Sequence, residues 1–168
     1  MGMKRTGAAY SSFFMVFALL TAAVPGRAAP MVSVTTPDAA VRGRPDIGAE
    51  VLWEAWIFTP LIVKKRLGAW LMVRDFQGYE GWIREYDTEK TPAVTIKTKK
   101  ANVRSGPGAD YSVEWEVDNG YTLRVVGRKG SWLLIEDNDG IEGWVHRSVT
   151  WGFVRPPERT GRTSDGSA

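Results

Sequence analysis

The second half of the chain alternates between short apolar runs and glycine-containing breaks. The runs "YTLRVVGR" at 121–128 and "SWLLIED" at 131–137 are rich in β-branched and aromatic residues, and glycine separates them. Runs of this length and composition predict β-strands rather than helices. The stretch "LLIEDNDGIEGWV" at 133–145 continues the second run through a polar break into a third apolar run. This pattern predicts a β-hairpin.

A three-residue loop at 138–140 gives the hairpin its most consistent register. It pairs Asp137 with Ile141, and it puts Gly140 where a type I turn followed by a bulge needs a positive φ. The further predicted pairs are Leu133 with Val145 and Leu134 with Trp144. We prefer this register to a two-residue loop because its cross-strand pairs group aliphatic residues with aliphatic residues.

The predicted hairpin has two apolar faces. One face carries Leu133, Ile135, Ile141 and Val145. The other carries Trp132, Leu134 and Trp144, which correspond to Trp70, Met72 and Trp82 in an earlier part of the chain. A small barrel has only one interior. The second face must therefore be covered by a long loop, by another domain or by a ligand.

The sequence repeats itself after 62 positions without a gap. Trp53-Glu54 aligns with Trp115-Glu116, and "EGW" at 80–82 aligns with "EGW" at 142–144. A fixed period of this kind indicates a tandem array. We call the two repeats copy one and copy two. Because domains of about 60 residues bury only about 60% of their surface, we expect the copies to pack together through their second apolar faces.

The N-terminus has the pattern of a secretory signal peptide. Lys4 and Arg5 precede an apolar run at 13–24, and small residues then lead to a predicted cleavage site after Ala28. The run is short for a membrane span, which needs about 20 apolar residues. We therefore assign 1–28 as a signal peptide and expect a periplasmic or secreted protein. An uncleaved membrane anchor is the alternative.

Charge argues against a nucleic-acid partner. Residues 1–28 hold three of the 22 basic residues and no acidic one, so the remainder has 19 residues of each sign. Nucleic-acid binding depends on a basic surface that neutralises phosphates. At the other end of the chain, residues 155–168 are polar and contain proline and glycine, and we expect a disordered tail.

Candidate catalytic residues are few. The chain has no cysteine, and His146 is its one histidine. A Cys-His pair and a multi-histidine zinc site are therefore excluded. A site using His146 and Ser148 would lack the nucleophile-elbow motif. We expect no catalytic residues, no cofactor and no metal, and hence a protein that is not an enzyme.

Copy two resembles the bacterial SH3 (SH3b) family. The family pattern is carried by "NVRSGPG" at 102–108, "GSW" at 130–132 and "DGIEGWV" at 139–145. Copy one reads "AVRGRPD" at 40–46, so the serine and both glycines of the opening are replaced. The pair is similar to the tandem SH3 proteins that Gram-negative bacteria export. The resemblance predicts an all-β protein of two tandem SH3-type small β-barrels, each with five or six strands.

The resemblance also sets the expected domain bounds. Domain 1, which is divergent, is expected at 33–86, a linker at 87–96, and domain 2 at 97–152. It implies binding of cell-wall peptides or of a protein partner rather than catalysis. The expected groove lies between the loop that begins at Arg104 and the hairpin that ends at Trp144.

Six residues of copy two are candidates for ligand binding. They are Arg104, Tyr111, Trp115, Trp132, Asp137 and Trp144. Tyr111 is the preferred contact, because its counterpart Ala49 has no ring. Structural roles remain open for the others. The tryptophans at 132 and 144 fit the core of a small domain, and Arg104 and Asp137, which recur as Arg42 and Asp75, fit an ion pair between loop and hairpin.

The leading functional hypothesis is an exported, non-catalytic protein that binds peptidoglycan peptides or a similar envelope ligand. The alternative is a periplasmic adaptor that docks a peptide segment of another envelope protein. In a third hypothesis, copy one is degenerate and serves only as a structural scaffold for copy two. The sequence does not identify the ligand or the oligomeric state.

Export gives the first testable prediction. The mature protein is expected to begin near Ala29 and to be recovered outside the membrane fraction, because the n-region, apolar run and cleavage site occur in the required order. N-terminal sequencing of protein from fractionated cells checks this. A terminus at Met1 or Met3 in the membrane fraction would support the anchor instead.

Overall fold

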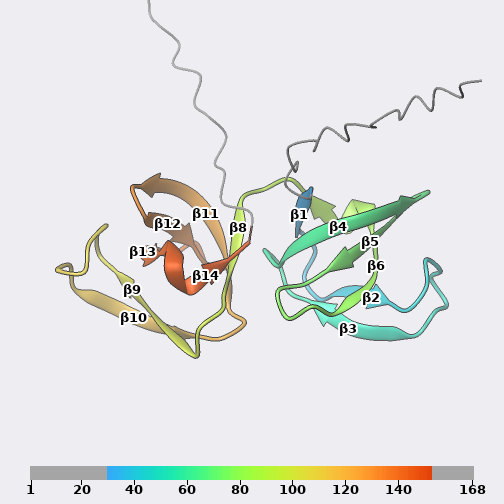
Figure 1. Ribbon diagram of the computed structural model, residues 1–168, viewed down its shortest axis with the longest axis horizontal. Helices are drawn as coiled ribbons and strands as arrows, with labels where there is room; N and C mark the ends of the chain where they lie inside the picture. The colour runs from blue at the N-terminus through green and yellow to red at the C-terminus, as the bar shows by residue number, and fades with distance from the viewer. Residues whose placement is uncertain (1–29, 153–168) are drawn as a thin grey trace, which may run out of the picture.

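The computed structural model describes residues 30–152, which form two β-sheet units side by side. In Figure 1, copy one runs from blue to green and copy two from yellow-green to red. The assigned signal peptide and the predicted tail at 155–168 lie outside the described residues. Within 30–152 the secondary structure is strand and two short 3-10 helices, and no helix there is long and apolar enough to cross a membrane.

Each copy has seven strands and one 3-10 helix in the same order. Copy one contains β1 (Met31–Val34), β2 (Ala39–Arg42), β3 (Val51–Ala55), β4 (Pro60–Leu67), β5 (Trp70–Arg74), β6 (Glu80–Arg84), η1 (Glu85–Asp87) and β7 (Thr88–Glu89). Copy two contains β8 (Ala93–Ile96), β9 (Lys100–Arg104), β10 (Val113–Asp118), β11 (Thr122–Lys129), β12 (Trp132–Glu136), β13 (Glu142–His146), η2 (Arg147–Val149) and β14 (Thr150–Trp151). The all-β class and the tandem arrangement are confirmed, with seven strands in each unit rather than five or six.

The 62-residue repeat holds at the level of strand boundaries. β4, β5 and β6 become β11, β12 and β13 when 62 is added to both ends of each strand. The sheet orders correspond as well. They are β3-β2-β6-β5-β4-β1-β7 in copy one and β10-β9-β13-β12-β11-β8-β14 in copy two, and neighbouring strands run antiparallel.

The register of the copy-two hairpin is confirmed. Leu133 lies opposite Val145 and Leu134 opposite Trp144, and the Asp137 N–H donates to the Ile141 carbonyl at 3.1 Å. Gly140 has a φ of 83°, as the three-residue loop requires. In copy one, Gly78 occupies the same place in the turn with a φ of 96°.

Each copy has its own apolar core. In copy two the buried core consists of Val94, Ile96, Ala101, Val103, Val117, Leu123, Val125, Leu133, Ile135 and Val145. In copy one it consists of Val34, Ala39, Val41, Ala55, Leu61, Leu71, Val73 and Ile83. Ile141 was predicted on the core face but is 53% exposed. It belongs to the turn end of the hairpin, past the last core layer, where it lines a surface groove instead.

The expected linker at 87–96 contributes strands to both sheets. β7 pairs with β1, and β8 lies between β11 and β14 with all four of its residues buried. β8 is the counterpart of β1 after the 62-residue shift. Val94 and Ile96 complete the core of copy two, while the outward side of β8 lies against β4 of copy one. A strand buried on both faces lacks the polar alternation that would have marked it in the sequence.

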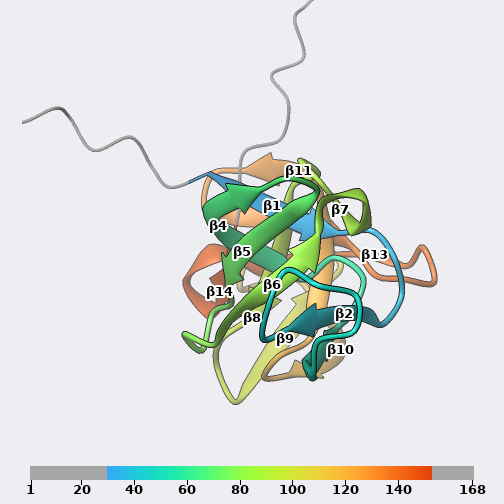
Figure 2. The ribbon, with the colours of Figure 1, turned by 90° about the vertical axis from the view of Figure 1, so that its right-hand side faces the viewer.

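The copies meet through β4, β8 and nearby loops. The Thr122 hydroxyl donates to the Ile57 carbonyl at 2.8 Å, and the rings of Phe76 and Trp151 lie 6.4 Å apart. Viewed from its copy-one side, the molecule has copy one in front of copy two (Figure 2). Mutual packing is thus observed, and none of these contacts involves a residue of the predicted second apolar faces.

Those second faces are covered at least in part by their own copy. Trp132, Leu134 and Trp144 are half-buried. The Trp132 ring makes an edge contact with His146 at 5.1 Å, and the Arg84 guanidinium lies 5.9 Å from the Trp70 ring. Neighbouring polar side chains of the same sheet therefore shield these rings, so the rings depend less on the other copy to cover them.

The hydroxyl that bridges the copies gives the second prediction. Thr122→Val keeps the side-chain shape but removes the donor to Ile57, and it should lower the free energy of unfolding by about 1 kcal/mol. Urea unfolding followed by tryptophan fluorescence measures this, and the parent should unfold in one transition. Thr98→Val is the control, because the exposed Thr98 hydroxyl bonds within its own loop. Two separate transitions in the parent would contradict coupling of the copies.

Candidate functional site

Copy two has a groove between β10 and the turn of its hairpin. Its volume is about 380 Å³, and we call it the copy-two groove. Its lining residues are Trp115, Glu116, Val117, Asp118, Tyr121, Asp137 and Ile141. Two of the six predicted site residues, Trp115 and Asp137, therefore come together here.

Copy one has a groove at the equivalent place. Its residues Trp53, Glu54, Ala55, Trp56, Thr59 and Asp75 stand 62 positions before lining residues of the copy-two groove. In copy one, however, the groove opens into a larger cavity of about 560 Å³ that copy two walls on one side. We call this cavity the inter-copy cleft. Its other lining residues are Ile57 and Phe76 from copy one, and Thr95, Asn119, Gly120, Tyr121, Thr122, Asn138 and Asp139 from copy two.

A glycine fixes the tryptophan at the base of each groove. A Cβ at Gly143 would lie 2.4 Å from Val103 and 2.8 Å from the Trp115 ring, closer than side chains approach one another. In copy one, a Cβ at Gly81 would lie 3.2 Å from the Trp53 ring. The glycine of "EGW" thus leaves room for the indole, which is partly buried against the core.

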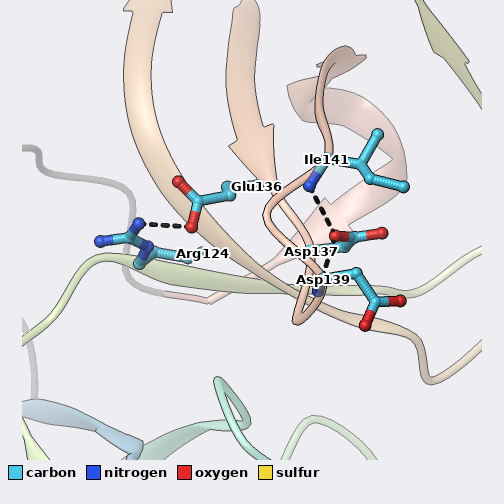
Figure 3. Close-up of polar contacts among 5 residues, drawn as sticks. All are labelled: Arg124, Glu136, Asp137, Asp139 and Ile141. Carbon is cyan, nitrogen blue, oxygen red and sulfur yellow. Dashed lines mark hydrogen bonds and ion pairs between the residues drawn. The ribbon is translucent and has the colours of Figure 1, made fainter.

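Asp137 holds the hairpin turn as well as lining the copy-two groove. It is 8% exposed, and its Oδ1 accepts the N–H groups of Asp139 at 2.9 Å and Ile141 at 2.8 Å (Figure 3). Asp75 does the same in copy one, where it accepts the N–H groups of Gln77 and Tyr79, both at 2.9 Å. The repeated aspartate therefore satisfies two backbone donors that the turn leaves without a partner.

The predicted ion pair between Arg104 and Asp137 is wrong. Arg104 Nη1 donates to the Tyr111 carbonyl at 2.7 Å, and Arg42 Nη1 donates to the Ala49 carbonyl at the same distance. Each arginine closes the loop that follows it. The guanidinium reaches the carbonyl across the loop and so links the start of the loop to its far side.

Tyr111 packs on the bend that precedes it. A Cβ at Gly106 would lie 2.1 Å from the Tyr111 ring, and one at Gly108 would lie 3.0 Å from it. The ring is 44% exposed and lines neither the copy-two groove nor the inter-copy cleft. Copy one replaces all three residues together, with Arg44, Asp46 and Ala49. The tyrosine and its glycines therefore form one unit of loop structure.

Trp144 and Trp132 lie on the outer face of copy two. Trp144 is half-buried and stands opposite Arg104 where β13 meets β9. The prediction that Trp144 belongs to the core is wrong, because its neighbours Gly143 and Val145 take the inward positions of β13. The six predicted residues thus fall into three places: the copy-two groove, the loop after Arg104, and the outer face.

Two exposed aromatic residues at the cavities escaped the sequence analysis. Trp56 is 69% exposed and lines the inter-copy cleft. Tyr121 is 43% exposed and lines both cavities. Burial, followed by the nearby Asp137 and Asp139 carboxylates, raises the pKa of the Tyr121 hydroxyl. The counterpart of Tyr121 is Thr59, so the comparison that favoured Tyr111 would have selected Tyr121 as well.

The loop after β3 is strained where it borders the inter-copy cleft. Phe58 has a φ of 63°, and its counterpart in copy two is Gly120 with a φ of 87°. A bulky residue in this region is unusual, since its Cβ crowds the following carbonyl at a cost of about 1–2 kcal/mol. Copy one therefore holds the loop that carries Trp56 and Ile57 in a conformation that glycine adopts more easily.

The described residues contain no cluster suited to a metal. Between residues 30 and 152, no three histidine, cysteine or acidic side chains converge to hold an ion. His146 Nδ1 lies 2.7 Å from the Ser148 hydroxyl, and its ring rests against Trp132. Together these contacts tie the end of β13 to η2.

The chain belongs to the bacterial SH3 domain family. The family description matches residues 36–89 and 97–152, so each copy is matched separately. This confirms the resemblance drawn from "NVRSGPG" and "DGIEGWV", and it includes copy one despite its altered opening.

Curated relatives share the domain within much longer proteins. A putative N-acetylmuramoyl-L-alanine amidase of Bacillus subtilis is 34% identical over 75 residues, which cover 45% of this chain and 14% of that protein. A probable cell wall amidase of Staphylococcus epidermidis is 38% identical over 58 residues, covering 34% of this chain and 20% of that protein. This chain therefore spans no more than a fifth of either relative.

Solved structures with a related arrangement are more distant. The NlpC2 protein of Trichomonas vaginalis aligns with a TM-score of 0.33 and 16% identity, covering 72% of this chain and 47% of that one. An NlpC/P60 family protein of Bacillus cereus aligns with a TM-score of 0.35 and 13% identity, covering 73% and 56%. With scores this low, family membership rests on the sequence match.

The turn aspartate gives the third prediction. Asp137→Ala removes the acceptor for two backbone N–H groups and should lower the free energy of unfolding by about 1–3 kcal/mol. Asp137→Asn retains an oxygen acceptor and should lose less. Denaturant unfolding of both variants measures the difference. Equal losses would show that the charge of Asp137, rather than its two hydrogen bonds, stabilises the turn.

Proposed function

We propose that this protein is an exported, non-enzymatic binding protein whose two bacterial SH3 domains recognise peptides of the cell wall. The observation that carries the proposal is the recurrence of one groove, at equivalent residues, in both copies. Each groove has a tryptophan at its base, namely Trp53 or Trp115, and carboxylates at its edge. Such a surface suits a short peptide, because an aromatic plane buries apolar groups while the carboxylates bind amines or amide N–H groups.

The relatives support the wall as the source of the ligand. Their names describe a cell wall amidase and an N-acetylmuramoyl-L-alanine amidase, and the shared part is the SH3 domain. A binding domain attached to a wall enzyme would serve to hold that enzyme on its substrate. We infer the same ligand class for this chain, with binding as its activity.

The N-terminal sequence supports the compartment. Lys4 and Arg5, the apolar run at 13–24 and the small residues before Ala29 favour export, which would bring the SH3 domains to the wall. The other function considered, an adaptor that docks a peptide of an envelope protein, would use the same grooves. The two differ in which material retains the protein.

Binding to purified, insoluble cell wall gives the fourth prediction. The parent should sediment with the wall, and Tyr121→Ala should weaken binding by more than about 1 kcal/mol, the usual threshold for a major contact. Tyr121 is chosen because it lines both cavities. Co-sedimentation at a series of protein concentrations measures the loss.

Tyr111→Ala is the matched control, since Tyr111 was the contact preferred from the sequence but lines neither cavity. It should bind the wall like the parent while losing some stability. Loss of binding by Tyr111→Ala alone would move the site to the loop after Arg104. No sedimentation of the parent, with capture of an envelope protein from extract, would favour the adaptor.

A further inference from the structure

The inter-copy cleft is the copy-one groove with a second wall. Copy one supplies the tryptophans and the strained loop after β3, and copy two supplies the loop at 119–122 and the hairpin turn at 138–139. The Thr122 hydroxyl, bonded to the Ile57 carbonyl, ties the two walls together. The copy-two groove, by contrast, is lined by copy two alone.

A buried hydroxyl without a partner lies at the base of the cleft. Thr95 is 1% exposed, lines the cleft, and its Oγ1 makes no hydrogen bond. Its neighbours Val94 and Ile96 point into the core, so alternation along β8 directs Thr95 outward, toward copy one. An unpaired buried hydroxyl destabilises the folded state and is uncommon in folded proteins.

The counterpart of Thr95 shows that the position can be satisfied. Ser33 occupies the same place in β1 and is equally buried. Its hydroxyl donates to the Thr91 carbonyl at 2.9 Å. The missing bond at Thr95 is therefore specific to the cleft and is not a property of the fold.

The charge of the cleft selects its ligand. Its lining includes the carboxylates of Glu54, Asp75 and Asp139 and no lysine or arginine. Its apolar lining comes from Trp53, Trp56, Phe76 and Tyr121. A carboxylate rim beside aromatic faces favours a cation, because both the negative charges and the ring faces attract it. An apolar group beside the cation would fill the rest of the floor.

We propose that the inter-copy cleft is a ligand site formed jointly by the two copies, and that it binds a peptide segment carrying a primary ammonium next to an apolar side chain. This deepens the proposed function, on which its choice of a peptide rests. In this proposal the principal binding site belongs to copy one, the divergent repeat. Copy two completes that site by forming its second wall. The ammonium lies among the carboxylates, and a polar backbone group of the peptide bonds the Thr95 hydroxyl.

A pair of peptides tests the ligand chemistry. The probe is acetyl-Ala-Lys-Leu-Ala-amide, and its match carries Nε-acetyl-lysine in place of lysine. Titration of the intact tandem protein, followed by NMR, should shift the amide signals of residues 54–57 and 119–122. The acetylated peptide should bind roughly tenfold more weakly, since hydrogen bonds to a charged group contribute about 1.5–3 kcal/mol. Equal binding of both peptides would overturn the proposed ammonium site.

Three variants locate the site. Asp139→Asn removes one carboxylate of the cleft and should weaken the lysine peptide several-fold. Thr95→Val should weaken it roughly fivefold, because a neutral hydrogen bond contributes about 1 kcal/mol, yet it should leave stability unchanged or raised. Asp118→Asn is the matched control, since Asp118 lines only the copy-two groove. A loss with Asp118→Asn and none with the other two would place the ligand in the copy-two groove and overturn the proposal.

The outcomes separate this inference from the proposed function. If the parent sediments with cell wall and the Asp139 and Thr95 variants sediment equally well, wall binding stands and the cleft is not its site. If the parent fails to sediment but binds the lysine peptide in the cleft, the ligand site stands and its source is not the wall. Amide shifts confined to residues outside the cleft contradict the inference in either case.

Discussion

The close approach of a tryptophan to a glycine organises each unit of this protein. A Cβ at Gly143 would lie 2.8 Å from the Trp115 ring, which is too close for a side chain, and a Cβ at Gly81 would lie 3.2 Å from the Trp53 ring, which is a tight contact. This contact holds β10 against the β13 side of the sheet while leaving one edge of the indole at the surface. The same ring therefore closes the core and forms the base of a groove. A domain of about 60 residues can bury little apolar area. One large ring that contributes both to the core and to a groove therefore suits a domain of this size.

The sequence predicted the repeated parts of the fold well. The 62-residue shift, the hairpin register and the position of Gly140 all follow from local patterns, and the structure confirms them. The partners of repeated polar residues could not be predicted in this way. Repetition shows that Arg104 and Asp137 matter in both copies, but each bonds the backbone of its own loop rather than the other's side chain. Sequence spacing does not distinguish a carbonyl or amide partner from an opposite charge.

Features of the structure that depend on the contact between the copies could not be predicted from the sequence either. β8 looks like a linker in sequence because one of its faces is covered by copy one and not by its own unit. The inter-copy cleft is formed by residues of both copies, so no sequence pattern within one repeat predicts it. Its aromatic residues Trp56 and Tyr121 stand at positions that differ between the copies. Positions that differ between the repeats were therefore as informative about the site as the shared motifs. Tyr111 was only one of several such positions.

The arrangement of the copies makes their equivalent surfaces unequal. Two units related by a repeat meet head to tail, so the surface that copy two offers to copy one is not the surface that copy one offers in return. The copy-one groove thereby gains a second wall and the copy-two groove does not, although both are built from matching residues. Two unfavourable features lie at the groove with two walls. Phe58 adopts a backbone conformation better suited to glycine. The buried Thr95 hydroxyl has no hydrogen-bond partner, whereas the hydroxyl of Ser33, at the equivalent position, has one. Strain and unpaired polar groups persist in folded proteins mainly where function retains them. Both features lie at a cleft that the two copies form together, and this distinguishes it from the copy-two groove as a place where the tandem arrangement itself has a use.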